Sequence, residues 1–148
     1  MNKWVAAHLA VILAGAATEV PTGRIGIGTN QNWADVLFTA LATMLAIVAL
    51  VWFQTKNPMQ AKPWRVPRWT SNPFGILQPL LSFHLAGWFF IGAGLADLAI
   101  WLVTRHGTFA GASFLLVLGL SGQLAVKVCV FYFDEMFATS SLALDDGT

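Results

Sequence analysis

Residues 79–103, PLLSFHLAGWFFIGAGLADLAIWLV, contain no Lys, Arg or Glu and a single Asp, Asp97, in an otherwise largely apolar stretch. A helix needs about 20 apolar residues to cross the hydrocarbon core of a bilayer, so this stretch is long enough to span a membrane. The whole chain of 148 residues is 57% hydrophobic and 10% charged, whereas roughly 25% of the residues in an average soluble domain are charged. We therefore predict an all-α integral membrane protein.

The charged residues are clustered, and the apolar windows between them predict four spans in a single membrane domain. Glycine, proline and polar residues separate the windows, and alternating spans of this kind predict an up-down bundle of four helices. A Pro- and Trp-rich basic loop follows the second span, and an acidic tail ends the chain. The predicted spans are residues 2–20, 33–53, 79–103 and 109–133, the loop is 54–73, and the tail is 134–148.

The first span has an alternative interpretation as a cleaved signal peptide. Lys3 precedes an apolar stretch that ends in small residues at 14–17, which is the order found in secretory signals. Cleavage would leave three helices. We favour retention, because the segment up to Val20, ended by Pro21, is long enough for a short span.

Basic residues predict the orientation, because cytoplasmic loops are enriched in Lys and Arg. Placing loop 54–73 inside leaves only Arg24 and Arg105 outside, so we expect both termini in the cytoplasm and a bacterial cytoplasmic membrane as the location. The cations and tryptophans of this loop are typical of a segment held against anionic lipid headgroups. The expected headgroup contacts are Lys56, Lys62, Arg65, Arg68, Trp64 and Trp69.

Charge and cysteine content exclude several classes of function. The net charge of +1 gives no basis for nucleic-acid binding, and one cysteine, Cys129, excludes a disulfide framework and a Cys-rich metal site. The sequence has no nucleophile elbow, phosphate loop or His-Glu-x-x-His motif. We therefore expect no enzymatic activity and no metal site.

Small residues share helix faces and predict where helices meet, because close backbone approach is a main source of helix association in lipid. We expect contacts at Gly87 and Gly94 of the third span and at Gly111 and Gly122 of the fourth, with Gly92 on the opposite, contact-free side of the third. The second span has a comparable stripe, formed by Asp35, Thr39, Ala42, Ala46 and Ala49.

Gln123 and Lys127 lie one turn apart on the fourth span, well away from its small residues. Lys127 can extend its ammonium group toward the nearby headgroups, a behaviour that needs no partner. The alternative is that both residues contact another subunit, a lipid headgroup or a cofactor.

Three side chains are expected at one depth in the membrane. His8 and His84 lie about four residues inside the cytoplasmic ends of their spans, and Lys127 about six. Two histidines at one level can ligate a b-type haem, and a cation beside them can bind a propionate or polarise a quinone carbonyl. The plainer interpretation is that each histidine is a hydrogen-bonded packing residue.

Asp97 is costly as an isolated anion inside a membrane and should be paired or protonated. Arg105 and Asp35 lie toward the same end of their spans and are the expected partners. A proton- or cation-coupled transport site is the alternative. Glu19 is expected to be a solvated helix end.

Three functions remain open at this point. The preferred one is a non-catalytic accessory or structural subunit of a larger energy-transducing or transport complex, whose partners are other membrane subunits and anionic lipids. The second is a membrane anchor that binds haem or quinone through His8, His84 and Lys127. The third is a small homo-oligomeric ion- or proton-coupled transporter centred on Asp97.

Overall fold

The computed structural model describes residues 2–22, 30–54 and 78–145, and all regular secondary structure in these ranges is helical. The helices are α1 (Lys3–Thr22), α2 (Trp33–Gln54), α3 (Gln78–Thr104) and α4 (Phe109–Asp145). The predicted all-α class is confirmed. α4 continues well beyond the end of the predicted fourth span, so much of the expected acidic tail is helical.

Three helices are long and apolar enough to cross a membrane, namely Trp33–Val51, Ser82–Thr104 and Phe109–Phe131. The apolar part of α1 is shorter, Val5–Glu19. Large apolar side chains face outward, for example Phe38, Val103 and Phe131, which are 74%, 85% and 72% exposed. An apolar surface of this kind suits lipid as the solvent, and together with the three spans it indicates an integral membrane protein.

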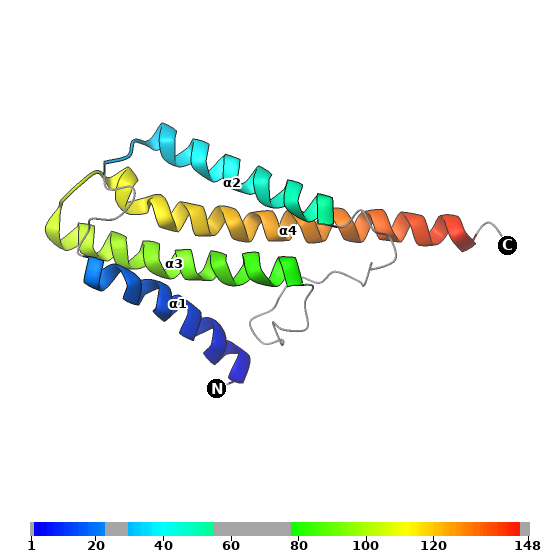
Figure 1. The fold of residues 1–148 in the computed structure, drawn as a ribbon, viewed down its shortest axis with the longest axis horizontal. Coiled ribbons are helices and arrows are strands. Elements are labelled where there is room, and N and C mark those ends of the chain that lie inside the picture. The colour runs from blue at the N-terminus through cyan, green and yellow to red at the C-terminus, as the bar shows by residue number, and fades with distance from the viewer. Residues whose placement is uncertain (1, 23–29, 55–77, 146–148) are drawn as a thin grey trace.

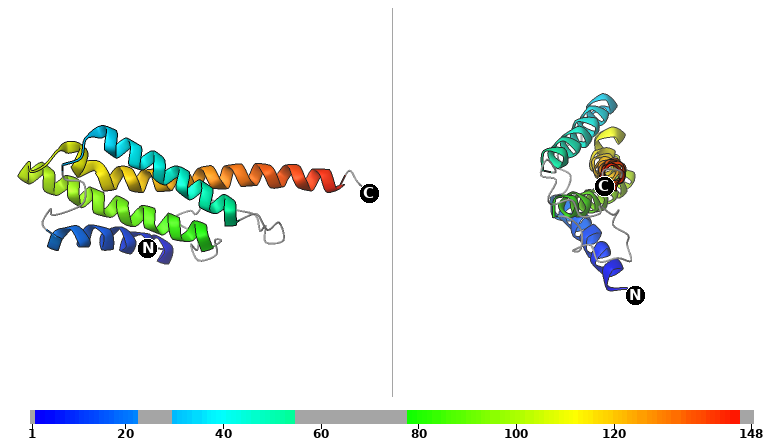
Figure 2. Two further views of the ribbon diagram at one scale, coloured as in Figure 1. Left: turned by 45° about the horizontal axis from the view of Figure 1, so that its top comes forward. Right: turned by 90° about the vertical axis from the view of Figure 1, so that its right-hand side faces the viewer.

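The helices form an open row in the order α1, α3, α4, α2 (Figures 1 and 2). Successive helices alternate in direction, so α1 runs parallel to α3, α2 runs parallel to α4, and α3 and α4 are antiparallel (Figure 1). α2 touches α3 only slightly. α2 is therefore attached to the other helices mainly through α4.

Glycines on two sides of α3 explain why α1 and α4 pack on different faces of this helix. A Cβ on Gly94 would lie 2.1 Å from the backbone nitrogen of Leu116 in α4, and one on Gly92 would lie 2.0 Å from the carbonyl oxygen of Ile12 in α1. Both distances are far below van der Waals contact, so α3 meets a different helix backbone on each side. The expectation that Gly92 faces no helix was wrong, because α3 has two contact faces rather than one.

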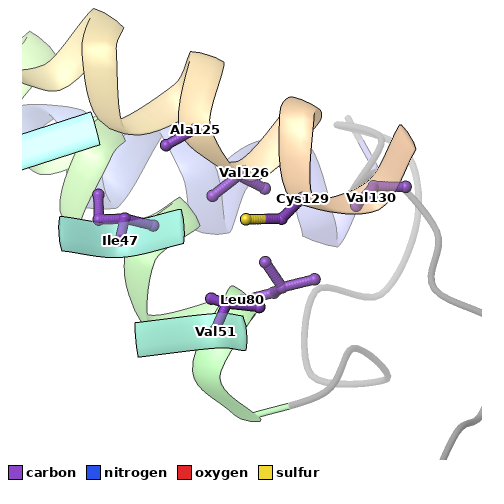
Figure 3. Packing of buried hydrophobic residues seen from close by; sticks show 7 residues of the cluster. All are labelled: Ile47, Val51, Leu80, Ala125, Val126, Cys129 and Val130. Atoms are coloured by element: carbon purple, nitrogen blue, oxygen red, sulfur yellow. The ribbon is translucent and has the colours of Figure 1, made fainter. Parts of the chain in front are cut away.

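α2 docks on α4 through apolar side chains rather than through its small residues. Figure 3 shows Ile47 and Val51 of α2 packed against the α4 side chains around Cys129, with Leu80 of α3 completing the cluster. A second cluster joins Val36 to α4 near the other end. The α2 stripe expected to make contacts is instead largely exposed, at Asp35, Ala42, Ala46 and Ala49.

The turn between α3 and α4 is fixed by local hydrogen bonds. Arg105 and Gly107 have φ values of 55° and 76°, which end α3 and reverse the chain. Thr108 then caps α4, because its Oγ1 accepts a hydrogen bond of 3.0 Å from the amide of Gly111. The same hydroxyl donates to the carbonyl oxygen of Gln31 at 2.6 Å, which ties the segment before α2 to this turn.

Candidate functional site

Three buried titratable side chains lie where α1 meets α3. Among the described residues, His8, His84 and Asp97 are 0%, 3% and 6% exposed. We call this contact the α1–α3 seam, and it also contains Glu19 and the glycines Gly15 and Gly92 at its centre. The seam residues are His8, Ile12, Gly15 and Glu19 of α1 and His84, Phe89, Gly92, Ala93 and Asp97 of α3.

The centre of the seam is a direct backbone contact. A Cβ on Gly15 would lie 2.0 Å from the carbonyl oxygen of Phe89, and the corresponding atom on Gly92 would lie equally close to the carbonyl oxygen of Ile12. Only glycine permits this approach, because any side chain would hold the two backbones apart. The close contact brings short polar side chains on either side of it within hydrogen-bonding distance.

One end of the seam holds a histidine pair. The Nε2 atoms of His8 and His84 lie 3.0 Å apart, and the ring planes meet at 76° with centroids separated by 5.2 Å. The structure thus brings together the two histidines that the sequence placed at one depth. Their edge-to-edge arrangement is that of a direct N–H···N hydrogen bond.

Gln123 of α4 holds His84 from the other side. Its Nε2 donates to the carbonyl oxygen of His84 at 2.7 Å, and its Oε1 lies 3.0 Å from His84 Nδ1. Gly87 provides the space, because a Cβ there would lie 2.5 Å from Gln123 Nε2. Gly87, which was expected at a helix contact, therefore leaves room for the Gln123 side chain as well as for the approach of α4.

This network fixes the protons on both rings. A backbone carbonyl only accepts, so the Gln123 amide nitrogen must face it and Oε1 must face His84 Nδ1. His84 Nδ1 is then the donor to Gln123, and in the neutral ring its Nε2 is an acceptor. The hydrogen bond between the rings therefore requires His8 to carry its proton on Nε2.

The other end of the seam holds a carboxyl pair. Glu19 of α1 and Asp97 of α3 share a side-chain hydrogen bond. A hydrogen bond between two carboxyl groups needs a proton on one of them, so the pair is at least singly protonated when the bond is made. The pair carries at most one negative charge in that state.

This pairing corrects two expectations about Asp97. Its partner in the structure is Glu19, which is half-buried rather than a solvated helix end. The expected partners are both exposed: Arg105 lies over the Trp101 ring, 4.7 Å from its centroid, and the amide of Asp35 is capped by Asn32.

Glu19 was missed although the sequence carried a signal for it. His8, Gly15 and Glu19 are spaced by seven and four residues, which places them on one face of a helix. A charge at the end of an apolar segment suggests a solvated helix end. Glu19 is instead half-buried, because α1 packs against α3 and brings Glu19 beside Asp97.

Lys127 is not part of the histidine cluster. Its side chain is exposed, whereas Gln123, one turn earlier, is half-buried and turned toward α3. The two residues therefore do not act as one stripe.

The two glycines of α4 that were expected at helix contacts, Gly111 and Gly122, are both buried. Gly122 has room for a methyl group, since a Cβ there would lie 3.8 Å from Gly87 Cα.

The seam does not fit a haem. Two nitrogens that ligate one iron from opposite sides lie about 4 Å apart, since each metal–nitrogen bond is about 2 Å, whereas the two Nε2 atoms lie 3.0 Å apart. A porphyrin must also fit between α1 and α3, whose backbones touch at Gly15 and Gly92. Among the described residues, no group of three or more His, Cys, Asp and Glu side chains is placed to bind a metal ion.

Comparison of the chain with known protein families, curated proteins and solved structures finds no match. The function must therefore be argued from the seam itself. The predicted headgroup contacts at Lys56, Lys62, Arg65, Arg68, Trp64 and Trp69 lie outside the described residues.

Proposed function

We propose that the protein is a proton-coupled membrane transporter in which Glu19 and Asp97 bind the exchangeable proton. The observation that carries this proposal is the hydrogen bond between the two carboxyl groups, one of which belongs to a buried residue of an apolar span. Ionisable residues within a membrane are rare and costly, and those that occur mark ion or proton pathways in many pumps and transporters.

The chemistry follows from the cost of charge in an apolar environment. With one proton the pair is held together by its hydrogen bond, and with a second it is neutral. Loss of the last proton leaves two carboxylates side by side, which repel each other and are poorly solvated. A cation that enters as the proton leaves would restore the balance, so exchange of a proton for a cationic substrate suits this pair.

The proposed orientation gives each pair a side of the membrane. Five basic residues against two favour both termini inside, which places the start of α1 and α3 at the cytoplasmic face. The histidine pair then lies toward the cytoplasm and the carboxyl pair toward the outer face. We propose a bacterial cytoplasmic membrane with the basic loop against anionic lipid.

The test is proton movement in liposomes that contain the purified protein and a trapped pH indicator. We expect a potential-driven proton flux or a cation-dependent one, and we expect Asp97→Asn and Glu19→Gln each to abolish it, because an amide keeps the shape of the pair but cannot exchange a proton. Asp35→Asn is the matched control, since Asp35 is an exposed acid on α2. Equal flux in Asp97→Asn and the unaltered protein would refute the proposal.

An accessory subunit of a larger membrane complex is the second candidate, and the open row favours it. α2 contacts α4 on one side only, while its small residues Ala42, Ala46 and Ala49 face outward, where another helix can approach closely. The same face is available to a second copy of this chain in a homo-oligomeric transporter.

Purification in mild detergent separates these assemblies. A partner protein retained by the unaltered chain and lost from Ala46→Leu supports the accessory role. Self-association that is lost in the same variant supports the homo-oligomer. An unaltered chain that purifies as a monomer without partners contradicts both assemblies.

A further inference from the structure

We propose that the turn between α3 and α4 binds the phosphodiester group of a phospholipid, and that Arg105, held against the ring of Trp101, contacts the phosphate. The inference goes beyond proton transport at the carboxyl pair and stands whether or not that transport occurs. It rests on the level of the turn in the membrane, on the aromatic rings around it, and on the backbone conformation of Arg105.

The turn lies where apolar spans end. The span in α3 ends at Thr104, the span in α4 begins at Phe109, and the span in α2 begins at Trp33, at the same end of the row (Figure 1). Arg105 is therefore one residue beyond the apolar part of α3. Because the polar headgroups begin directly outside the hydrocarbon core, its guanidinium group is at the depth of the lipid phosphates.

Aromatic rings from three helices meet beside this turn. The ring of Phe109 lies 5.2 Å from that of Trp101 and 5.8 Å from that of Trp33, measured between centroids. Trp33 and Phe109 are 46% and 48% exposed. Partly exposed rings at the ends of spans are typical of the headgroup level, where one side of the ring contacts acyl chains and the other is wet.

Arg105 has a backbone conformation that favours glycine. Its φ of 55° lies in the left-handed region, where a side chain is strained, and the other residue of the turn with a positive φ is a glycine, Gly107. Non-glycine residues held in this region cluster at functional and ligand-binding sites. The conformation therefore directs attention to the Arg105 side chain.

The Trp101 ring holds the guanidinium group of Arg105 by one face. Arg105 Cζ lies 4.7 Å from the centroid of the ring, and the ring is oriented by a hydrogen bond of 3.3 Å from its Nε1 to the carbonyl oxygen of Gly107. Among the described residues, no acidic side chain pairs with Arg105. The N–H groups of a guanidinium lie in its plane, so contact through the face leaves them available to two oxygens of one phosphate.

The surface below the turn favours a phospholipid over a free phosphate ion. A free ion would gain only an exposed ion pair with Arg105, which is weak in water. A phospholipid adds contact between its acyl chains and the apolar side chains of the last turn of α3, where Leu102 and Val103 are 54% and 85% exposed.

The experiment is solid-state NMR of the full-length protein with ¹⁵N-labelled arginine, in bilayers of phosphatidylglycerol and phosphatidylethanolamine and in phosphate-free buffer. The chain has four arginines, and the signal of Arg105 is the one missing from Arg105→Lys. We expect dipolar coupling between the guanidinium nitrogens and lipid ³¹P at a separation of about 4 Å, which follows from a charge-assisted N–H···O bond of about 2.8 Å. Absence of this coupling would overturn the proposal.

A second bilayer separates the two sources of phosphate. The protein is placed in a phosphate-free glycolipid, with inorganic phosphate added to the buffer. We expect no coupling at Arg105, because the free ion lacks the acyl chains. Coupling as strong as that in phospholipid would show that the turn binds phosphate ions and would contradict a lipid site.

Two substitutions of Trp101 test the role of the ring. Trp101→Phe and Trp101→Leu both remove the hydrogen bond to Gly107, and only the first keeps an aromatic face for the guanidinium. We expect the coupling at Arg105 to persist in Trp101→Phe and to be lost from Trp101→Leu. Equal coupling in the two variants, whether kept in both or lost from both, would show that the ring does not hold Arg105 on the phosphate.

Discussion

The backbone contact between α1 and α3 makes Gly92→Ala a severe change for so small a substitution. The added Cβ would start 2.0 Å from the carbonyl oxygen of Ile12, and this oxygen belongs to a helix backbone that cannot move by itself. Ordinary contact begins at 3.4 Å, so α1 must move away from α3 by about 1.4 Å. We therefore expect the substitution to separate the two helices rather than to be absorbed locally.

The separation has a consequence at the histidine pair. If α1 moves as a rigid body along the line between the two Nε2 atoms, the distance between His8 and His84 goes from 3.0 Å to about 4.4 Å, which is beyond hydrogen bonding. Overpacking costs about 1–3 kcal/mol, and a hydrogen bond between membrane helices contributes about 0.6 kcal/mol. The free energy of unfolding should fall by about 2–4 kcal/mol from these two effects together.

Gly122→Ala is the matched control. Gly122 is also a buried helical glycine, but its Cβ would meet Gly87 Cα at 3.8 Å and Ile47 Cδ1 at 4.0 Å, which is ordinary contact. Both substitutions gain the same helix propensity, about 1 kcal/mol, so this term cancels when the variants are compared.

The assay is reversible unfolding in mixed detergent micelles, followed by tryptophan fluorescence. We expect Gly92→Ala to be less stable than Gly122→Ala by about 2–4 kcal/mol. Equal stability of the two variants would show that α1 does not pack against α3 at Gly92, and the seam described above would then be wrong.

Three further predictions concern the ends and the surface of the row. Thr108→Ala should lower stability by about 1–2 kcal/mol, because it removes the cap of α4 and the bond to Gln31, whereas Thr104→Ala, whose hydroxyl bonds only within α3 at Ile100, should cost less in the same unfolding assay. Lys127→Met should leave the free energy of unfolding unchanged, since the side chain is exposed. If this variant loses a partner protein or lipid that co-purifies with the unaltered chain, Lys127 makes an external contact. If the complex stays intact, the side chain only extends to the headgroups. Reporter fusions should place the residues after Arg24 outside and the C-terminus inside, and an active periplasmic reporter after Thr148 would reverse the orientation.

The helices were predictable from the sequence because hydropathy over about 20 residues sets where a chain can cross a membrane. The predicted spans 33–53 and 79–103 differ from α2 and α3 by one residue at the ends. The fourth span was predicted to end at 133, where charges begin, whereas α4 continues to Asp145, because a helix outside the bilayer does not require apolar residues.

The choice of neighbours was not predictable by the same reasoning. Small residues occur on more than one face of α3, and a stripe of them does not name the helix that it meets. The structure uses the Gly92 face for α1 and the Gly94 face for α4, and it leaves the alanine stripe of α2 outside. The depth of a residue in the membrane follows from its position along a span, without knowledge of the neighbouring helices. This reasoning placed His8 and His84 at one level. The pairing of Asp97 with Glu19 depended on the neighbour, and depth alone could not supply it.

α1 is the least obvious membrane segment, yet it carries the partners of the polar groups in α3. His8 meets His84 and Glu19 meets Asp97, and both partners stand on the face that carries Gly15. Without α1 those groups of α3 would face lipid, where an unsatisfied polar group costs several kcal/mol. In the folded chain, α1 therefore supplies partners for both His84 and Asp97. The same packing explains why so short a segment is stable beside α3, since a backbone contact and two polar pairs supply what its limited apolar length does not.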